Sequence, residues 1–323
     1  MFIKKLLIKI AYVCMVLVWL EGCQGCHRVV ISPSERSQIP DRGGIPNLGN
    51  TCYMNAVLQI IAKLYPDVFA NAHSDLTKAG QVIVNKIKDD QDYVTEDAAE
   101  AFYDAFLNIH EGRGQFERDR QEDAGEFLQV ILQDQGFPPS LHTAESLSTP
   151  GRHSGESDDP PMRREYHILT LSINANGDSN LNLRDLIAYY SVLEEVELDD
   201  SISGRAQKQL LLSLGSSRLL PIQLGRFNSN LNKIGANITN TMSLIISEST
   251  QYSPKGHPSD LHYDLQGFVV HKGPSMRSGH YIACIQQAGQ WKLYNDETVT
   301  NITLDQAEKC ARQGYLYFYR RTS

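Results

Sequence analysis

The stretch Gly44–Gln59, GIPNLGNTCYMNAVLQ, decides how the rest of the chain is interpreted. Its first half is rich in glycine, proline and asparagine, which supply the backbone angles of tight turns, so it predicts a loop. From Tyr53 to Leu64 the apolar residues recur at helical spacing and indicate a helix with one buried face. Cys52 therefore lies at a loop-to-helix junction. Unpaired backbone N–H groups and the positive end of the helix dipole should favour a thiolate there, which suits a nucleophile.

A single cysteine is more often an inert core residue than a nucleophile, so the surrounding residues matter. The run from Asn47 to Gln59 resembles the Cys box of the ubiquitin-specific proteases, a family of deubiquitinases. In that family the cysteine attacks the carbonyl that joins the C-terminal glycine of ubiquitin to a lysine, and an asparagine five residues earlier helps to hold the oxyanion. The resemblance gives these two roles to Cys52 and Asn47.

Length and composition are those of an ordinary globular protein. The chain has 323 residues, of which 41% are apolar and 21% are charged, so it can bury a full core as one large domain or two. The formal net charge of −8 argues against a nucleic-acid partner, which normally requires a basic face. We therefore expect no nucleic-acid binding.

Residues 1–26 differ from the rest of the chain. Lysines come first, an apolar run over 10–20 follows, and small residues and cysteines end the segment. These are the parts of a secretory signal, and the apolar run is shorter than the ~20 residues that a spanning helix needs. The end of the segment also resembles a bacterial lipoprotein cleavage site at Cys23. We predict an export leader over 1–26, with membrane contact only if it is retained, and a polar linker over 27–42.

The cysteine distribution does not indicate a disulfide framework. Three of the six cysteines lie in or beside the leader, and Cys52, Cys284 and Cys310 remain. Export of a thiol that must stay reduced suggests a secreted effector that acts in the reducing cytosol of a host cell, since oxidising compartments would threaten the nucleophile. Cys23 and Cys26 have no matching second pair, so we expect no metal site, and no cofactor is implied.

The apolar periodicity changes once along the chain. Helical faces fill residues 43–137, with Thr95 as the expected N-cap of one helix, and strand-like alternation occupies 166–323. Residues 138–165 are dominated by Ser, Thr, Gly, Pro and Asp, which predicts a flexible loop. Helices followed by an antiparallel-looking sheet predict an α+β fold. The resemblance implies a papain-like cysteine peptidase with a helical thumb lobe and a β-rich palm with reduced fingers.

A second motif lies at the start of the last helix predicted within residues 43–137. The run Gln121–Leu128, QEDAGEFL, resembles the family segment that lines the channel for the basic C-terminal tail of ubiquitin. The resemblance makes Gln121, Asp123 and Glu126 candidates for substrate binding, with the two carboxylates pairing with arginines of the tail. The same acidic residues would also stabilise the positive end of a helix dipole without any role in binding.

Two clusters in the strand-rich half supply the groups that a thiolate nucleophile needs. His280 leads into one predicted strand and Asn295 ends the next, so a hairpin turning near Gly289 would bring imidazole and carboxamide together. An imidazole can take the thiol proton and later protonate the leaving amine, and a hydrogen-bonding partner fixes its tautomer. Either cluster alone is weak, because most histidines are surface or core residues.

The two clusters together resemble the His box of the same protease family. The resemblance makes His280 the base, Asn295 the third catalytic residue, and Asp296 a second candidate that would aid the oxyanion or the histidine. It also makes Tyr281 a candidate for substrate binding. His271 precedes the box, and we expect it to be structural.

These observations favour a deubiquitinase that hydrolyses the bond after the C-terminal glycine of ubiquitin by a Cys-His-Asn thiol mechanism. The expected partners are ubiquitin and ubiquitinated proteins, and we expect a monomer. Two alternatives stay open: a protease for a ubiquitin-like modifier, and a catalytically inactive ubiquitin-binding protein.

Overall fold

The computed structural model of the protein describes most of the chain from residue 43 onward. The described ranges are 43–71, 73–88, 93–111, 116–148, 162–173, 180–190, 194–197, 205–213, 218–247, 251 and 259–322. The predicted leader and linker over 1–42 lie outside them and stay predictions. Within the described residues, no helix combines the length and the apolar character that a membrane crossing requires.

Four helices come first in the described chain, and strands with two further helices follow. The helices are α2 (Cys52–Leu64), α3 (Asp75–Lys88), α4 (Glu96–His110), α5 (Ala124–Asp134), α6 (Leu183–Tyr190) and α7 (Leu304–Ala311). The strands are β1 (Leu141–Ser148), β2 (Met162–Tyr166), β3 (Leu169–Ser172), β4 (Asn180–Asn182), β5 (Glu194–Glu197), β6 (Arg205–Ser213), β7 (Leu219–Gly225), β8 (Asn237–Thr239), β9 (Ser243–Ile246), β10 (Leu261–Ser275), β11 (Ser278–Gln287), β12 (Gln290–Asn295), β13 (Thr298–Ile302) and β14 (Gly314–Arg321).

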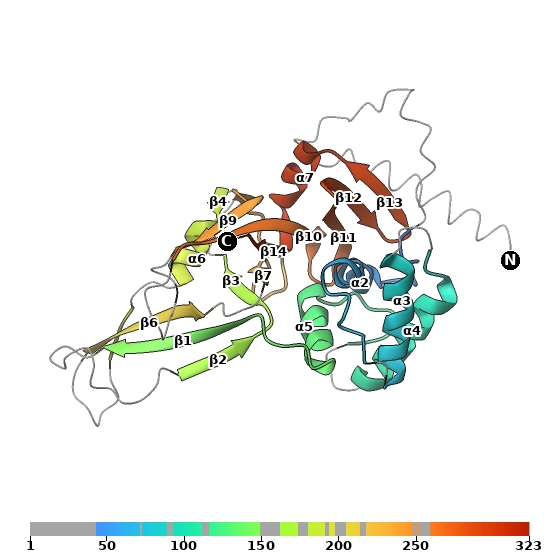
Figure 1. The fold of residues 1–323 in the computed structure, drawn as a ribbon, viewed down its shortest axis with the longest axis horizontal. Helices are drawn as coiled ribbons and strands as arrows, with labels where there is room; N and C mark the ends of the chain where they lie inside the picture. Colours follow the sequence, from blue (N-terminus) through green and yellow to red (C-terminus); the bar gives the residue numbers. More distant parts are fainter. Residues whose placement is uncertain are drawn as a thin grey trace. The chain divides into compact units, whose positions relative to one another are not determined.

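Helix α2 is the central element of the helical half. Every residue of α2 except Lys63 is buried, because the helix packs against α3 and α5 and also against β10, β11 and β12 (Figure 1). Thr95 caps α4 by accepting a hydrogen bond from the Ala98 N–H, as the sequence predicts. Helices α2 to α5 thus occupy the region in which the sequence predicts a helical lobe.

The largest sheet has the strand order β13-β12-β11-β10-β14-β7-β3, and β9 pairs with β10 off this path. Its strands pair antiparallel except β3 and β7, which run parallel. The parallel pair differs from the predicted antiparallel sheet, because a long connection separates β3 from β7 and parallel strands need such a crossover. The α+β fold class predicted from the sequence is confirmed.

Alternate residues of β11 face opposite sides of this sheet. Tyr281, Ala283 and Ile285 belong to the core shared with the helices α2 to α5. Ile282 and Cys284 belong to a second core on the other face, to which α6 and α7 also contribute. The middle of β11 is therefore buried on both faces, and its side chains from Tyr281 to Ile285 point alternately into one core and the other.

The segment 138–165 differs from the flexible loop that its composition predicts. β1 and β2 lie within it and join β6 and β5 in an antiparallel sheet of order β2-β1-β6-β5. Residues 149–161 lie outside the described part of the chain. Composition could not reveal β1, because its main-chain pairing with β6 involves residues much later in the sequence. A further short parallel pair joins β4 and β8.

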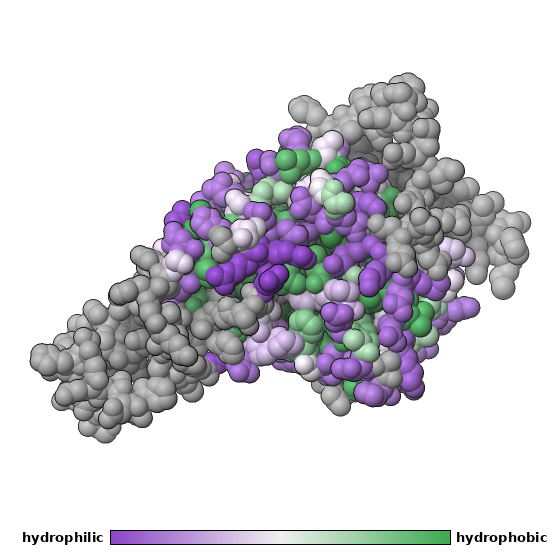
Figure 2. All heavy atoms as spheres, viewed as in Figure 1, coloured by the Kyte–Doolittle hydropathy of each residue, from purple (hydrophilic) through white to green (hydrophobic). Residues whose placement is uncertain are grey.

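The described surface is largely hydrophilic. On the face shown in Figure 2, apolar residues form small separate areas among polar ones. The exposed large apolar side chains are Val82, Tyr93, Tyr189 and Leu304, which come from separate segments. The buried polar residues are the better guide to a functional site.

Candidate active site

The loop that precedes α2 docks tightly against the turn between β12 and β13. The Ile45 N–H donates to the Asp296 backbone carbonyl at 2.9 Å. A Cβ on Gly44 would lie 2.0 Å from that same oxygen, so only glycine fits at this position. Asp296 has a φ of 50°, in the left-handed region that aspartate tolerates better than most residues. This close approach sets the turn beside the start of α2.

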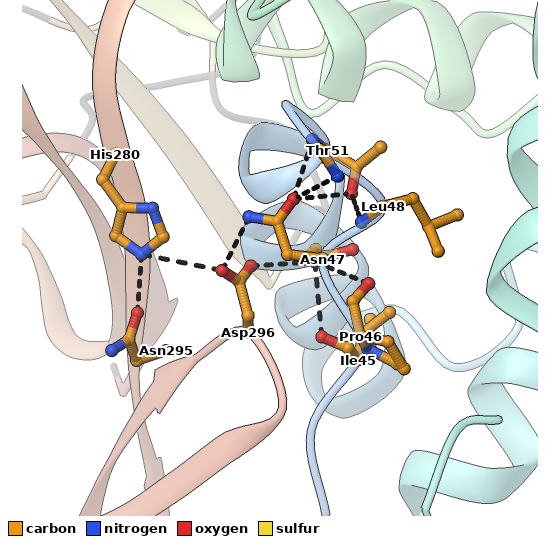
Figure 3. Close-up of polar contacts among 10 residues, drawn as sticks. Ile45, Pro46, Asn47, Leu48, Thr51, His280, Asn295 and Asp296 are labelled. Carbon is orange, nitrogen blue, oxygen red and sulfur yellow. Dashed lines mark hydrogen bonds and ion pairs between the residues drawn. The ribbon is translucent and has the colours of Figure 1, made fainter. Parts of the chain in front are cut away.

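The Asp296 carboxylate is the acceptor at the centre of the site (Figure 3). Its Oδ2 accepts from Asn47 Nδ2 at 2.9 Å, and its Oδ1 accepts from Asn55 Nδ2 at 2.8 Å. Asn55 Nδ2 also lies 3.3 Å from the carbonyls of Ile45 and Pro46. Asp296 is only 8% exposed, so these amide donors replace the water that a carboxylate normally requires. Asp296 thus joins the loop and α2 to the β12–β13 turn.

The carboxamide of Asn47 holds its own loop. Its Oδ1 accepts from the backbone N–H groups of Gly49 at 3.0 Å and Thr51 at 3.3 Å. The Thr51 hydroxyl in turn accepts from the Leu48 N–H at 3.0 Å. One N–H of the Asn47 amide is used by Asp296, and a primary amide carries two. The second N–H of Asn47 is therefore available to a ligand.

His280 and Asn295 meet across the predicted hairpin. β11 and β12 pair antiparallel and turn at Ala288 and Gly289, both with positive φ. His280 Nε2 lies 2.6 Å from Asn295 Oδ1 and 3.7 Å from Asp296 Oδ2. A carboxamide oxygen only accepts hydrogen bonds, so we assign the ring proton to Nε2, which leaves Nδ1 as the acceptor. The structure thus brings His280, Asn295 and Asp296 together.

Cys52 is the first residue of α2, as the sequence predicts, and is 3% exposed. Backbone N–H groups of Tyr281, Tyr53 and Cys52 itself donate toward the thiol. Burial nevertheless raises the pKa of the thiol to about 12, and the Asp296 carboxylate adds to the rise. The N–H groups of Cys52 and Tyr53 at the helix start do favour the thiolate, but desolvation of the enclosed sulfur outweighs them, so the expectation that this thiol ionises easily is wrong for this structure.

The thiol and the imidazole belong to adjacent parts of the site, and no hydrogen bond joins them. Tyr281, whose N–H faces the Cys52 sulfur, directly follows His280 in β11. Cys52 and His280 are both described, and no hydrogen bond joins them in this structure. The His280 side chain is 27% exposed, so the ring borders solvent beside the buried thiol.

Gln121 contacts the turn that leads to His280. Its Nε2 donates to the Met276 carbonyl at 2.8 Å and lies 3.2 Å from His271 Nε2. Both Gln121 and His271 are buried, and burial followed by the nearby Lys233 charge lowers the pKa of His271 to about 3. His271 is therefore neutral and packs in the core, as expected. The Gln121 side chain is committed to these internal contacts rather than exposed for the expected substrate binding.

The other predicted binding residues divide into buried and exposed ones. Asp123 is the N-cap of α5: it accepts from the Glu126 N–H at 2.8 Å and from the Tyr315 hydroxyl, and it is 5% exposed. The Tyr281 ring is also buried, between His271 and Tyr315. Glu126 is exposed. The expectation of direct substrate contact therefore fits the Glu126 side chain, whereas capping and core packing occupy Asp123 and Tyr281.

Asn55 is a site residue that the sequence pattern did not reveal. Its signal is a polar side chain within a helix that is buried on every side, where an unpaired amide would be costly. Recognising it required knowing that protein surrounds α2 completely. Among the described residues, no group of three or more His, Cys, Asp or Glu side chains could hold a metal ion.

The comparison with family models covers the segments that build this site. The model described as ubiquitin carboxyl-terminal hydrolase matches residues 43–138 and 218–319, which is more than half of the chain. Every residue of the site described above lies in these two segments. The sheet formed by β1, β2, β5 and β6 lies between these two segments in the sequence.

Two curated relatives match at low identity over most of the chain, and a third matches at higher identity over a quarter of it. The probable ubiquitin carboxyl-terminal hydrolase 16 of Schizosaccharomyces pombe is 25% identical over 321 residues, covering 88% of this chain and 68% of that protein. Ubiquitin carboxyl-terminal hydrolase 25 of Arabidopsis thaliana is 25% identical over 326 residues, covering 87% and 47%. Human ubiquitin carboxyl-terminal hydrolase 13 is 39% identical over 88 residues, covering 25% and 9%.

Solved structures share the fold. The SAGA module Ubp8/Sgf11/Sus1/Sgf73 bound to ubiquitin aldehyde gives a TM-score of 0.67 at 19% identity, covering 90% of this chain and 73% of that chain. The same module bound to monoubiquitin gives 0.69 at 20% identity, covering 96% and 74%. These similarities confirm the papain-like α+β architecture that the sequence predicts.

Proposed function

Since the chain belongs to the ubiquitin carboxyl-terminal hydrolase family, a family of cysteine-type deubiquitinases, we propose that Cys52, His280 and Asn295 carry out its hydrolysis. The observation that carries this proposal is the convergence of three polar elements on the start of α2. They are the His280–Asn295 pair, the Asp296 carboxylate with its two asparagine donors, and the Tyr281 N–H that faces the thiol.

The first step is attack by the Cys52 sulfur on the carbonyl carbon of the C-terminal glycine of ubiquitin. The thiol is neutral in the free enzyme, because burial raises its pKa. His280 therefore has to receive the proton at Nδ1 as the sulfur attacks, which requires the ring to come within hydrogen-bonding distance of the thiol. Asn295 holds Nε2–H during this transfer and so keeps the tautomer fixed.

The negative charge on the carbonyl oxygen needs donors that are already oriented. The backbone N–H groups at the start of α2 point to the sulfur position, and the free N–H of Asn47 lies on the same loop. Asp296 holds the Asn47 amide from one side, and the loop N–H groups hold its oxygen from the other. Asn47 is therefore fixed before the charge develops, and Asp296 acts as its positioning residue.

The second half of the reaction returns the enzyme to its starting state. Imidazolium at His280 protonates the leaving lysine amine, so the C–N bond breaks and a thioester remains on Cys52. A water molecule that His280 deprotonates then attacks the thioester carbonyl, and the sulfur leaves with a proton. The products are free ubiquitin with its C-terminal carboxylate and an unmodified lysine.

Binding of the ubiquitin tail is proposed to involve Glu126. This carboxylate lies on the first turn of α5 and is exposed, so it can pair with an arginine of the tail. Although Glu126 is exposed, partial desolvation by the surrounding protein and the neighbouring Asp123 carboxylate raise its pKa. An incoming cation would reverse this effect and favour the charged carboxylate.

A ubiquitin probe with a C-terminal electrophile tests the proposal directly. We expect the full chain to form a covalent adduct on Cys52, and the Cys52→Ala variant to form none while it still binds ubiquitin. Adduct formation with the variant, or its absence from the wild type when the protein is folded, would overturn the assignment. Binding without any adduct or turnover would identify an inactive ubiquitin-binding protein, and a parallel probe built on a ubiquitin-like modifier would identify the other alternative.

We also propose that the chain is a monomer and that residues 1–26 direct its export as a secreted effector. The composition of the leader supports export, with membrane contact only if the segment is retained. Light scattering of the purified protein tests the oligomeric state. Fractionation of cells that express the full chain, compared with a chain lacking residues 1–26, tests export.

A further inference from the structure

Two cysteines that the proposed hydrolysis does not use lie beside each other on the face of the largest sheet that is turned away from α2. Cys284 is on β11 and is completely buried. Cys310 is near the end of α7 and is partly exposed. Cys310 packs against the core cluster that contains Cys284, each thiol is the other's side-chain hydrogen-bonding neighbour, and neither cysteine is in a disulfide in this structure.

The fold explains why the two sulfurs meet. Cys284 pairs with Phe268 on β10 and with Leu293 on β12, so it sits in the middle of three strands. Helix α7 packs across β10 and β12, the two strands that flank β11. The helix therefore presents Cys310 to the strand between them, and the core around both cysteines holds the pair in place.

The surroundings make Cys310 the reactive member of the pair. The hydrogen bond from Cys284 lowers the pKa of Cys310 despite its burial, and the Lys272 ammonium lowers it further. The same bond, together with burial, raises the pKa of Cys284. Cys310 ionises more easily and reaches solvent, and the buried Cys284 lies beside it. This is the arrangement of an attacking cysteine, Cys310, and a resolving cysteine, Cys284.

We propose that Cys284 and Cys310 form an oxidation site that a hydroperoxide converts into an intramolecular disulfide. In the first step the Cys310 thiolate attacks one peroxide oxygen: an S–O bond forms, the O–O bond breaks, and the other oxygen leaves as water or alcohol after taking a proton. In the second step the Cys284 sulfur attacks the sulfenic sulfur of Cys310. An S–S bond forms, the S–O bond breaks, and the hydroxide leaves as water with the Cys284 proton.

The electron balance closes with the peroxide as the only oxidant. The two sulfurs together lose two electrons, and the O–O bond of the peroxide gains them. A dithiol such as dithiothreitol reverses the reaction by thiol–disulfide exchange. No metal is needed, and among the described residues the pair has no further His, Cys, Asp or Glu ligands with which to build a metal site.

Cys52 cannot take the place of either member. Its sulfur belongs to the core on the other side of β11, so the sheet separates it from Cys284. Burial also keeps the Cys52 thiol neutral. A small oxidant should therefore react at Cys310 before it reacts at the proposed nucleophile.

Peptide mapping after a limited oxidation tests this directly. The reduced full chain is treated with an equimolar amount of hydrogen peroxide, its remaining thiols are alkylated, and it is digested with trypsin. Cleavage after Arg277 and Lys292 releases Ser278–Lys292, and cleavage after Lys309 and Arg312 releases Cys310–Arg312. We expect these two peptides to be joined by a disulfide that dithiothreitol removes.

Variants separate this site from the active site. Cys310→Ser should abolish the linked peptide, and Cys284→Ala gives a second test that adds no polar group to the core. Cys52→Ala should leave the linkage unchanged, so the result does not depend on the proposed hydrolysis. Recovery of both Cys284 and Cys310 as alkylated thiols, with Cys52 oxidised instead, would overturn the proposal, as would a linkage that survives Cys310→Ser.

Discussion

The two faces of β11 hold cysteines in opposite chemical states. On the face that packs against α2, the Cys52 sulfur is enclosed, and burial raises its pKa to about 12. On the other face, the Cys284 hydrogen bond lowers the pKa of Cys310. The proposed nucleophile is thus the less reactive thiol at rest, and a thiol with no part in the proposed hydrolysis is the more reactive one.

Burial and a direct hydrogen-bonding partner, rather than the position of each cysteine on its helix, decide the direction of both pKa shifts. Cys52 begins α2, where the dipole favours the thiolate, and Cys310 lies near the C-terminal end of α7, where it opposes one. Both pKa shifts run against the dipole. The position of a cysteine on a helix therefore helps to locate it in a site, but it does not predict whether the thiol is ionised. Ionisation depends on solvent and on the immediate partners of the sulfur.

Removing the two thiols one at a time should give the largest difference in hydrolysis rate between variants. Cys52→Ala should lower the hydrolysis of a ubiquitin C-terminal fluorogenic substrate by at least about 10⁴-fold, because no other group can form the thioester. Cys310→Ser should stay close to the wild-type rate in the absence of oxidant. A comparable loss in both variants, with both proteins folded, would remove the distinction between the faces.

The oxyanion donor should give the next largest effect. Asn47→Ala removes the N–H proposed to contact the developing charge, and we expect turnover to fall by about 10²–10³-fold with little change in KM. Asn301→Ala is a matched control, because Asn301 is exposed on β13, away from the Asp296 contacts. Unchanged turnover in Asn47→Ala would exclude this asparagine from the chemistry.

Alkylation at two pH values measures the contrast between the thiols themselves. Between pH 7 and pH 9 the rate of iodoacetamide labelling at Cys52 should rise about 10²-fold, because its pKa lies above this range and the thiolate fraction grows tenfold per unit. Cys310, with its lowered pKa, should gain only about twofold over the same interval. Mass spectrometry of the two peptides gives both rates in one sample, and equal slopes would contradict the difference.

A fall in pH should lower the free energy of unfolding because of His271, which is buried on the face of the sheet that packs against the helices. Its folded pKa of about 3 lies below the unfolded value of 6.5, so the unfolded chain takes up a proton first as the pH falls. The stabilisation from neutral His271 is complete above pH 6.5 and is lost progressively toward pH 3. Between pH 7.5 and pH 5 this costs about 2 kcal/mol.

Denaturant unfolding at both pH values tests this prediction. His271→Gln has no titrating ring, so its free energy of unfolding should fall by about 2 kcal/mol less than that of the wild type over this interval. A parallel decline in the two proteins would show that other groups account for the acid sensitivity.

Much of the fold could be predicted because its signals are local. The period of the apolar residues reveals α2 to α5 and the strands β3, β7, β9, β10, β11, β12 and β14, and Thr95 marks a helix start that the structure confirms. The strands β1 and β6 could not be predicted in this way. They stabilise each other by main-chain pairing between segments that are far apart in the sequence.

The features of the site also divide into those that local sequence signals predict and those that only the complete fold reveals. The hairpin that joins His280 to Asn295 could be predicted, because consecutive strands usually pair. The pKa of Cys52 could not, because burial depends on everything packed around α2. Asn55 and the Gln121 contact with His271 were hidden for the same reason, since each joins residues that only the finished fold brings together.

The docking of the Gly44 loop against Asp296 determines when the site can assemble during synthesis of the chain. The Asn47 and Asn55 contacts with Asp296 span most of the chain, so a ribosome completes the nucleophile long before it makes the residues that orient its surroundings. A nascent chain therefore carries an inert cysteine until the β12–β13 turn has emerged. Hydrolysis should therefore begin only after Asp296 has been made, and we expect products truncated before this residue to be inactive.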